Sequence, residues 1–294
     1  MKKCLLLMLI MLLPILSCSN TGIESGGIPE WASDLMKKVP YDSEMAEVSN
    51  VQAIREDPDL QCIYTDWRHT FNFSSVNQYT GSMLNFTYHW PTVCDLNQVD
   101  YMVNGWNSSF IIATVDIEKV ESFLNDGGWS RSEYDGFTVW SIEVVSGEYS
   151  INKSVAFNQT YVIAGLTDWV SSTIDTINGK QPSICEKEQF QDLMALIPDA
   201  GLGVTYSEFD FEIDKQSSIK LIDAIGVSKK DGDHLSYTIV VTGENGSMSD
   251  DLVRVFIDKF KSDEIFNQSE IKTKRSGIYV IFTADVPLSN LSGR

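Results

Sequence analysis

The sequence predicts an α+β protein of two related lobes, each an antiparallel sheet packed with helices. Two observations predict this duplicated layout. The motif Asp-Leu-Met-x-x-aliphatic-Pro occurs twice, beginning at Asp34 and at Asp192. After each copy, strand-like, helix-like and strand-like stretches follow in the same order, as an internal duplication would leave them. We therefore expect a first lobe over residues 34–182 and a second lobe over residues 183–294.

Hydrophobic spacing places the elements of each lobe. A strand-like run follows each motif copy, at residues 44–49 and 201–211. The later strand, helix and strand of the first lobe are expected at 108–115, 116–126 and 160–166, and those of the second lobe at 235–241, 249–260 and 277–286.

Capping and turn residues support these elements. Ser183 followed by Glu186 forms a capping box ahead of a helix. Thr167 is expected to cap the next helix upstream, which the pair Asn178-Gly179 ends. Asp135-Gly136 between two short alternating runs is a strong hairpin signal.

A further helix is expected after Asp57, which can cap it with Pro58 at the first helical position. Its apolar stripe has helical spacing and consists of Leu60, Ile63, Tyr64, Trp67 and Phe71.

The start of the chain predicts a secretory signal over residues 1–17. Lys2 and Lys3 precede an apolar run of about a dozen residues, which is too short to span a bilayer. Ile15-Leu16-Ser17 before Cys18 resembles the lipobox of prokaryotic lipoproteins, in which the cysteine is lipidated and becomes the first mature residue. The alternative is an ordinary signal peptide, cut near Ser17 or Ser19, that leaves no lipid.

Residues 18–33 are small, polar and Gly-rich at their start, which is typical of a flexible tether. Together with a lipid on Cys18, this predicts a body held at the extracellular face of the cell membrane.

The formal charge of −19 excludes some classes of partner. Loss of Lys2 and Lys3 with the signal peptide makes the mature chain still more acidic. Nucleic acid and anionic lipid surfaces would repel such a chain, so we expect no nucleic-acid partner.

Asn-x-Ser/Thr triplets are more frequent than composition explains. Fifteen asparagines in a chain that is about one-sixth Ser and Thr should yield two or three by chance, and the sequence has eight. In an exported protein these triplets are N-glycosylation acceptors. They are Asn72, Asn85, Asn107, Asn152, Asn158, Asn245, Asn267 and Asn290. A lipobox with many such triplets is typical of an archaeal surface protein, and a Ser/Thr-rich bacterial surface protein is the alternative.

Three cysteines are left when Cys4 is removed and Cys18 is lipidated. Export permits a disulfide, and Cys62–Cys94 is the pair that we expect. Three buried free thiols are the alternative. Cys185 lies at a helix start, where a thiol pKa can be lowered, but no candidate base adjoins it in the sequence, so a structural role is expected.

Motifs for chemistry are scarce, and no catalytic, cofactor-binding or metal-ligating residues are predicted. His69, His89 and His234 have no zinc-site spacing. Asp231, Asp233 and Glu244 lack the length and spacing of a calcium loop. Clustering of Trp67, Trp90 and Trp106 would suit glycan stacking, although core packing is the simpler use of these side chains.

The stretch from Val99 to Trp140 resembles a family of uncharacterised, membrane-anchored prokaryotic surface proteins. The matching positions are Val99, Asp100, Asp116, Val120, Leu124, Gly128, Trp129, Tyr134, Gly136 and Trp140. A Gly usual before the Asp is absent, since Thr114-Val115 stand there. The resemblance implies a two-lobed α+β body with antiparallel sheets and supplies no catalytic residues.

These observations predict a lipid-anchored extracellular surface protein that acts as a non-enzymatic binding or envelope-structural module. Its expected partners are the membrane, through the anchor, and an extracellular protein, glycan or small ligand. A ligand-binding lipoprotein that serves a transporter is the first alternative, and a hydrolase is the second.

Overall fold

The structure is a computed structural model that describes residues 27–60, 98–105, 108–146, 149–198, 200–214, 217–230, 232–244, 246, 248–262, 265–266 and 268–290. The strands before residue 183 are β1 (Met45–Asn50), β2 (Val99–Gly105), β3 (Ser108–Ala113), β4 (Ser130–Tyr134), β5 (Phe137–Ser146), β6 (Tyr149–Phe157) and β7 (Tyr161–Leu166). Those after it are β8 (Gly203–Asp214), β9 (Ser217–Lys230), β10 (His234–Gly243), β11 (Ile271–Ser276) and β12 (Tyr279–Pro287).

The described helices are fewer and mostly short. They are α2 (Glu30–Met36), α3 (Val51–Glu56), α7 (Ile117–Asp126), α8 (Thr167–Ile177), α9 (Glu188–Met194) and α10 (Asp250–Ser262), with 3-10 turns η4 (Ile184–Glu186) and η5 (Leu288–Asn290).

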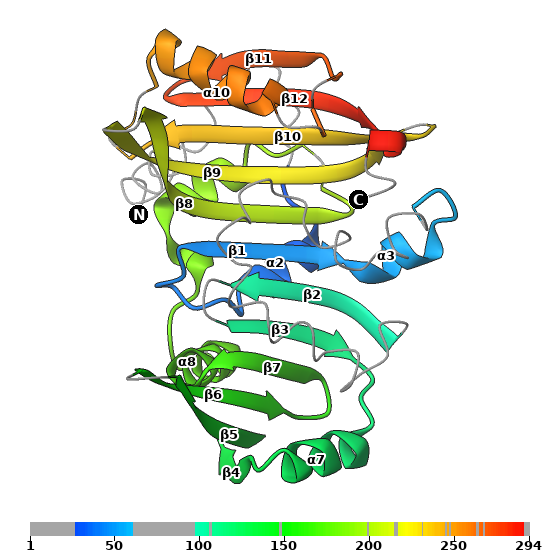
Figure 1. Ribbon diagram of the computed structural model, residues 1–294. Helices are drawn as coiled ribbons and strands as arrows, with labels where there is room; N and C mark the ends of the chain where they lie inside the picture. Colours follow the sequence, from blue (N-terminus) through cyan, green and yellow to red (C-terminus); the bar gives the residue numbers. More distant parts are fainter. Residues whose placement is uncertain are drawn as a thin grey trace, which may run out of the picture.

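All described strands join one twelve-stranded sheet in the order β11-β12-β10-β9-β8-β1-β2-β3-β7-β6-β5-β4 (Figure 1). Every neighbouring pair is antiparallel.

The prediction of two helix-packed lobes is wrong, because strands dominate the fold and the sheet is continuous across the expected lobe boundary. β1 pairs with β8 from Met45↔Ser207 to Ser49↔Gly203. The inner edge strands of the two halves therefore satisfy each other's backbone hydrogen bonds instead of ending two separate sheets.

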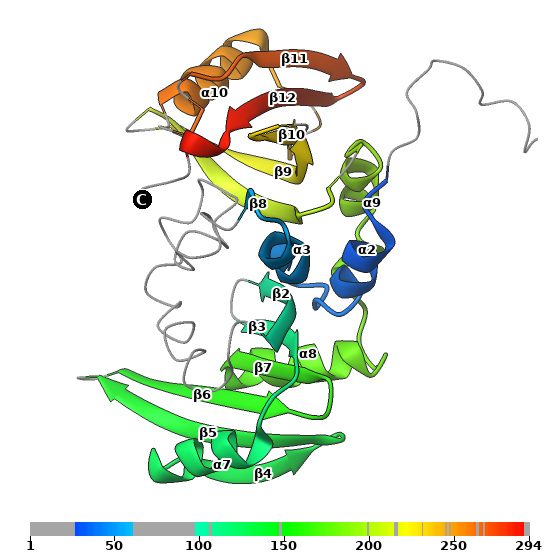
Figure 2. The ribbon, with the colours of Figure 1, turned by 90° about the vertical axis from the view of Figure 1, so that its right-hand side faces the viewer.

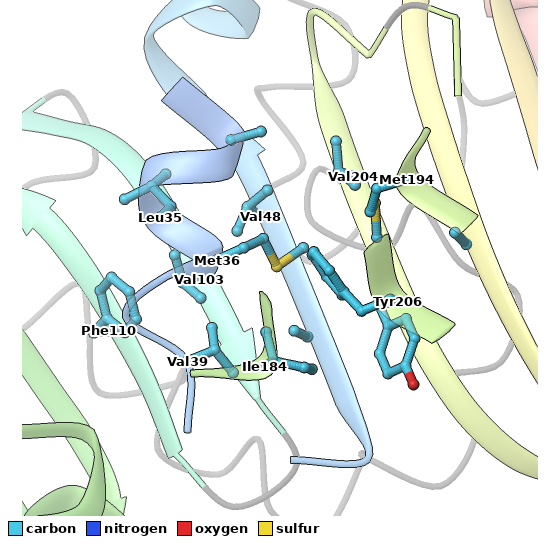
Figure 3. Close-up of a cluster of buried hydrophobic side chains, with 14 of the residues drawn as sticks. Leu35, Met36, Val39, Val48, Val103, Phe110, Ile184, Met194, Val204 and Tyr206 are labelled. Atoms are coloured by element: carbon cyan, nitrogen blue, oxygen red, sulfur yellow. The ribbon is translucent and has the colours of Figure 1, made fainter. Parts of the chain in front are cut away.

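One core runs under this junction. Helices α2, α8 and α9 cover the first face of the sheet, on the right of Figure 2. Leu35, Met36, Val39, Val48, Val103 and Phe110 meet Ile184, Met194, Val204 and Tyr206 in a single buried cluster (Figure 3). Because side chains from both halves share this cluster, the described body has no apolar boundary at residue 183.

The two motif copies lie at corresponding places beside the junction. Met36 and Met194 are both buried in the shared cluster. Glu47 and Thr205 stand at equivalent distances along the chain after the first and second motif copies. These two residues are direct partners at the middle of the β1·β8 pairing. The two strands therefore meet about a local two-fold axis.

The second face carries α3, α7 and α10 and has two separate apolar clusters. Leu252, Val253 and Phe256 of α10 pack on one end of the sheet. Val120 and Leu124 of α7 pack on the other end. Between them the face is polar.

Of the predicted turn and capping residues, some are confirmed and one is wrong. Asp135 (φ 49°) and Gly136 (φ 86°) form the predicted hairpin turn of β4 and β5. The capping box of Ser183 and Glu186 is present, but on η4 and not directly on α9. Thr167 does not cap α8, because its hydroxyl contacts Ser154 Oγ at 2.8 Å.

Two boundaries near the start of the body differ from expectation. α2 begins at Glu30, inside the segment given to the tether, because Ala32 is wholly buried in the core. A helix, α3, ends before Asp57, and Leu60 N–H donates to the Asp57 carbonyl in a turn. The rest of the helix expected there lies outside the described residues.

Candidate functional site

A strip of polar side chains crosses the middle of the second face, where β2, β1, β8 and β9 lie side by side. Glu47 is the cross-strand partner of both Asn104 and Thr205. We call the set Glu47, Ser49, Asn104, Thr205, Ser207 and Asp223 the central polar strip. It lies on the second face because Ala46 and Val48, which alternate with Glu47 and Ser49, belong to the core of the first face.

Apart from the half-buried Asn104, the side chains of the strip are buried, which is unusual for polar groups. Glu47 and Asp223 are each 1% exposed, and Ser49 is 0% exposed. Burying a carboxylate or hydroxyl costs free energy unless hydrogen bonds compensate, so a fold seldom retains such groups for packing alone. The strip is therefore the strongest candidate site in the described body.

Asp223 is the chemically distinctive member of the strip. Burial raises its pKa to about 7, and the hydrogen bond that the Ser207 hydroxyl donates to its Oδ1 opposes that shift only partly. The carboxyl therefore changes its protonation state near neutral pH.

Two other members of the strip leave polar atoms unsatisfied. Ser49 Oγ and Asn104 Oδ1 are buried and make no hydrogen bond. Oxygen atoms of this kind suit hard cations or ammonium groups. However, within the described ranges no three His, Cys, Asp or Glu side chains gather closely enough to hold a metal ion, so no metal is assigned.

A second, partly buried polar cluster lies at the edge of the first face and is structural. Lys187 Nζ lies 2.6 Å from Glu208 Oε1 and 3.0 Å from the Ser43 carbonyl. Tyr206 donates to the same Glu208 oxygen at 2.8 Å. Burial raises the pKa of Glu208, but the bonds from Lys187 and Tyr206 outweigh burial and hold it below its usual value. The cluster joins α9 to the loop before β1 and to β8.

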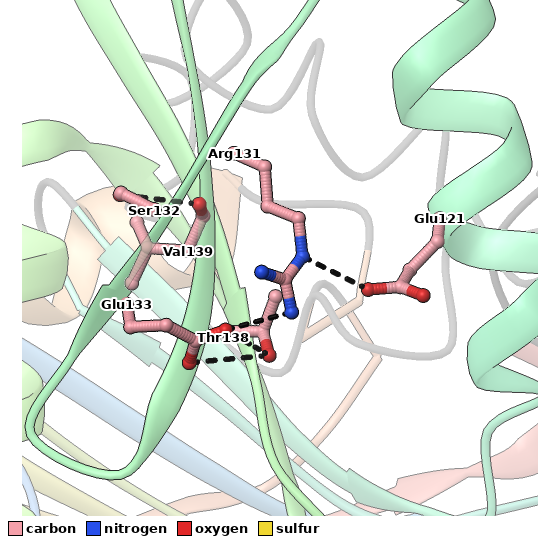
Figure 4. Close-up of polar contacts among 6 residues, drawn as sticks. All are labelled: Glu121, Arg131, Ser132, Glu133, Thr138 and Val139. Carbon is pink, nitrogen blue, oxygen red and sulfur yellow. Dashed lines mark hydrogen bonds and ion pairs between the residues drawn. The ribbon is translucent and has the colours of Figure 1, made fainter.

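Charged residues on edge strand β4 form a third cluster (Figure 4). Arg131 lies 3.4 Å from Glu121 of α7 and 2.7 Å from Glu133. All five β4 residues are exposed, so these pairs stabilise little. Charges here discourage another chain from adding to the sheet edge, and they do not form a site.

Three of the predicted glycosylation positions are described. Asn152 is exposed on β6. Asn158 shapes the β6–β7 turn, where its Oδ1 accepts from the amides of Thr160 and Tyr161. Asn290 donates its Nδ2 to the Ile265 carbonyl at 3.0 Å, so a glycan there would replace a hydrogen bond.

Other predicted positions have ordinary surroundings. Burial raises the pKa of the Cys185 thiol to about 11, away from the thiolate that a nucleophile needs. Asp233 Oδ1 lies 2.9 Å from Nδ1 of the half-buried His234, and Glu244 Oε1 lies 3.9 Å from Lys220 Nζ.

The remaining predicted positions lie outside the described residues. They are Cys18, Cys62, Cys94, Asn72, Asn85, Asn107, Asn245, Asn267, His69, His89, Asp231, Trp67, Trp90 and Trp106.

Sequence reasoning identified β1 and β8, which carry part of the central polar strip, but it did not predict β9 and missed the strip itself. The available signals were Glu47 and Ser49 within a strand-like run, and Asp223 alone among apolar residues in "LIDAIGV". Neither signal indicates that the residues converge, because the β1·β8 pairing that joins them is not local.

Comparisons with known proteins add no identification. No family model, no curated protein and no solved structure matches the chain. The resemblance of Val99–Trp140 to a surface-protein family therefore stays a prediction. Among the described residues, no helix combines the length and apolar character needed to cross a membrane.

Proposed function

We propose that this chain is a lipid-anchored protein of the extracellular face of the cell membrane, and that it serves as a non-enzymatic binding or envelope-structural module. One observation carries the proposal. The N-terminal sequence joins a charged start and a short apolar run to Ser17-Cys18, and a small, polar, Gly-rich segment follows.

Two features of the body support this arrangement. Gly27 is exposed where the described body begins, as attachment through a preceding tether requires. Asn152 is exposed on β6, and Asn158 lies in a turn, as glycan acceptors on an exported protein should.

The proposed role is binding by the folded body as a whole, and no catalysed reaction is proposed. The most perturbed carboxyl, Asp223, is wholly buried, and its described partner is a serine hydroxyl and not a nucleophile–base pair. A partner would be an extracellular protein, a glycan or a small ligand. Nucleic acid is disfavoured by the charge of −19.

Metabolic labelling tests the anchor. Cells of the native host that express the full chain are fed a clickable precursor of membrane acyl or isoprenoid chains. We expect the wild-type protein to carry the label, Cys18→Ala to lose it, and Cys185→Ala to keep it as the matched control. An unlabelled wild-type protein, or a label that survives Cys18→Ala, would contradict the proposal.

A further inference from the structure

The three described asparagines of the Asn-x-Ser/Thr triplets, Asn152, Asn158 and Asn290, differ in what their side chains contact. N-glycosylation uses two groups of a triplet together. The asparagine Nδ2 attacks the sugar, and the transferase recognises the hydroxyl two residues later. In a folded protein, a triplet is therefore competent only where neither group is already held by protein atoms.

Asn158 presents both groups. Its Oδ1 accepts hydrogen bonds from the Thr160 amide at 2.8 Å and from the Tyr161 amide at 2.9 Å. Because two N–H donors require an oxygen acceptor, these bonds fix the side-chain amide with Nδ2 directed away from the turn backbone. Within the described ranges, no acceptor binds Nδ2, and no partner binds the hydroxyl of the exposed Thr160.

The contacts of Asn158 also favour the transfer chemistry. Donors to Oδ1 stabilise the negative charge that gathers on this oxygen as Nδ2 gives up a proton. Nδ2 bonds to C1 of a sugar carried on a polyprenyl phosphate, and the C1–O bond to the carrier breaks. The carrier phosphate leaves with the electron pair of that bond, and the Nδ2 proton passes to solvent.

Asn152 is exposed on β6 but lacks an accessible hydroxyl. The hydroxyl of its triplet belongs to Ser154, which is 0% exposed. Ser154 Oγ lies 2.7 Å from Ser141 Oγ and 2.8 Å from Thr167 Oγ1. At Ser154, β6 pairs with β5 on one side and with β7 on the other, so a transferase reaches this hydroxyl only if β6 leaves the sheet.

Asn290 lacks a free nitrogen. Its Nδ2 donates to the Ile265 carbonyl at 3.0 Å, and a carbonyl oxygen requires a donor, so this amide is also fixed in orientation. The nitrogen that would attack the sugar is therefore already held against the body.

We propose that Asn158 is the asparagine that the folded protein offers for N-glycosylation, and that Asn152 and Asn290 stay unmodified. This assignment rests on the proposed function, because only an exported chain meets a sugar donor outside the cytoplasm. Occupancy then depends on the hydrogen bonds of each triplet in the fold, and not on the triplet sequence alone.

Site-resolved mass spectrometry of the full-length chain, purified from its native host, tests the assignment. We expect glycan occupancy at Asn158 at least about tenfold above that at Asn152 and Asn290, since freeing their missing groups breaks hydrogen bonds within the fold. Thr160→Ala should abolish glycosylation at Asn158, and Thr160→Ser, which keeps a hydroxyl, should retain it. Both variants change one exposed side chain and should leave the lipid labelling of Cys18 unchanged.

Two outcomes would overturn the assignment. One is glycan at Asn152 or Asn290 with the same occupancy as at Asn158, which would mean that transfer precedes folding. The other is an Asn158 that carries no glycan. If Cys18 is lipidated in that same sample, the assignment fails and the proposed anchor stands. Glycan at Asn158 on a chain without lipid would support the assignment and contradict the anchor.

Discussion

Burial of the Asp223 carboxyl makes the free energy of unfolding of this protein depend on pH. Its folded pKa of about 7 lies above the ordinary value of 3.8, so the folded state holds a proton that the unfolded state releases. The stability that this carboxyl contributes is complete below pH about 4, and it is lost as the pH rises through about 7.

Asp223→Asn should therefore raise the urea midpoint at pH 8 while changing it little at pH 4, because the amide mimics the protonated carboxyl and keeps an acceptor for Ser207. We expect about 4 kcal/mol of added stability at pH 8, because the pKa is raised from 3.8 to about 7 on folding. Urea denaturation of both proteins from pH 4 to pH 8 measures this. Parallel stability curves for the two proteins would refute the assignment.

Lys187 and Glu208 form a buried ion pair whose side chains are 13% and 16% exposed. Lys187→Met removes the charge that compensates Glu208, and it should cost about 3–5 kcal/mol of unfolding free energy. Lys37→Met is the matched control, because Lys37 and its partner Asp34 are 59% and 52% exposed and water screens their interaction. Equal losses in denaturant titrations of the two variants would show that burial does not decide the effect.

At the scale of elements, the β4–β5 hairpin depends on a turn that only certain residues adopt. Gly136 has φ 86°, and no atom lies near a Cβ built there, so only backbone conformation opposes a side chain. Gly136→Ala should lower the unfolding free energy by about 1 kcal/mol, whereas Gly27→Ala, also in open space but without positive φ, should be neutral. Thermal melts of both variants measure this difference, and equal melting temperatures would contradict the predicted effect of the positive φ at Gly136.

Periodicity predicted the individual elements well where burial is one-sided. α7 has Val120 and Leu124 buried at helical spacing, and Asp116 caps it by accepting from the Lys119 amide. β12 alternates buried and half-buried residues along its length. Such patterns depend on local chemistry, which the sequence displays directly.

The sequence did not predict how strands choose partners. β1 and β8 each look like the edge of a lobe, and nothing local indicates that they pair with each other. The same limit hid the central polar strip, since only the β1·β8 pairing places Glu47 and Asp223 on the same part of one sheet face, with β8 between their strands. Thr167 is a smaller example of the same limit. Its hydroxyl bonds to the hydroxyl of Ser154 on β6 and does not cap α8 as expected.

At the scale of the whole molecule, the shared core predicts that the two halves unfold together. Met36 of α2 is wholly buried against side chains of both halves. Met36→Ala should cost about 2–5 kcal/mol. Native-state hydrogen exchange should show amide protection falling together in β6–β7 and in β9–β10. Loss confined to residues 34–182 would mean that the halves are independent after all.

At this scale we propose that the chain works outside the cell, tied to the membrane through its first mature residue. Intact-mass analysis of the protein purified from its native host tests this most directly. We expect a polypeptide that starts at Cys18 and carries the added mass of lipid chains, with hexose-type increments if the sequons are occupied. A polypeptide that begins at Met1 and has no hydrophobic adduct would contradict it.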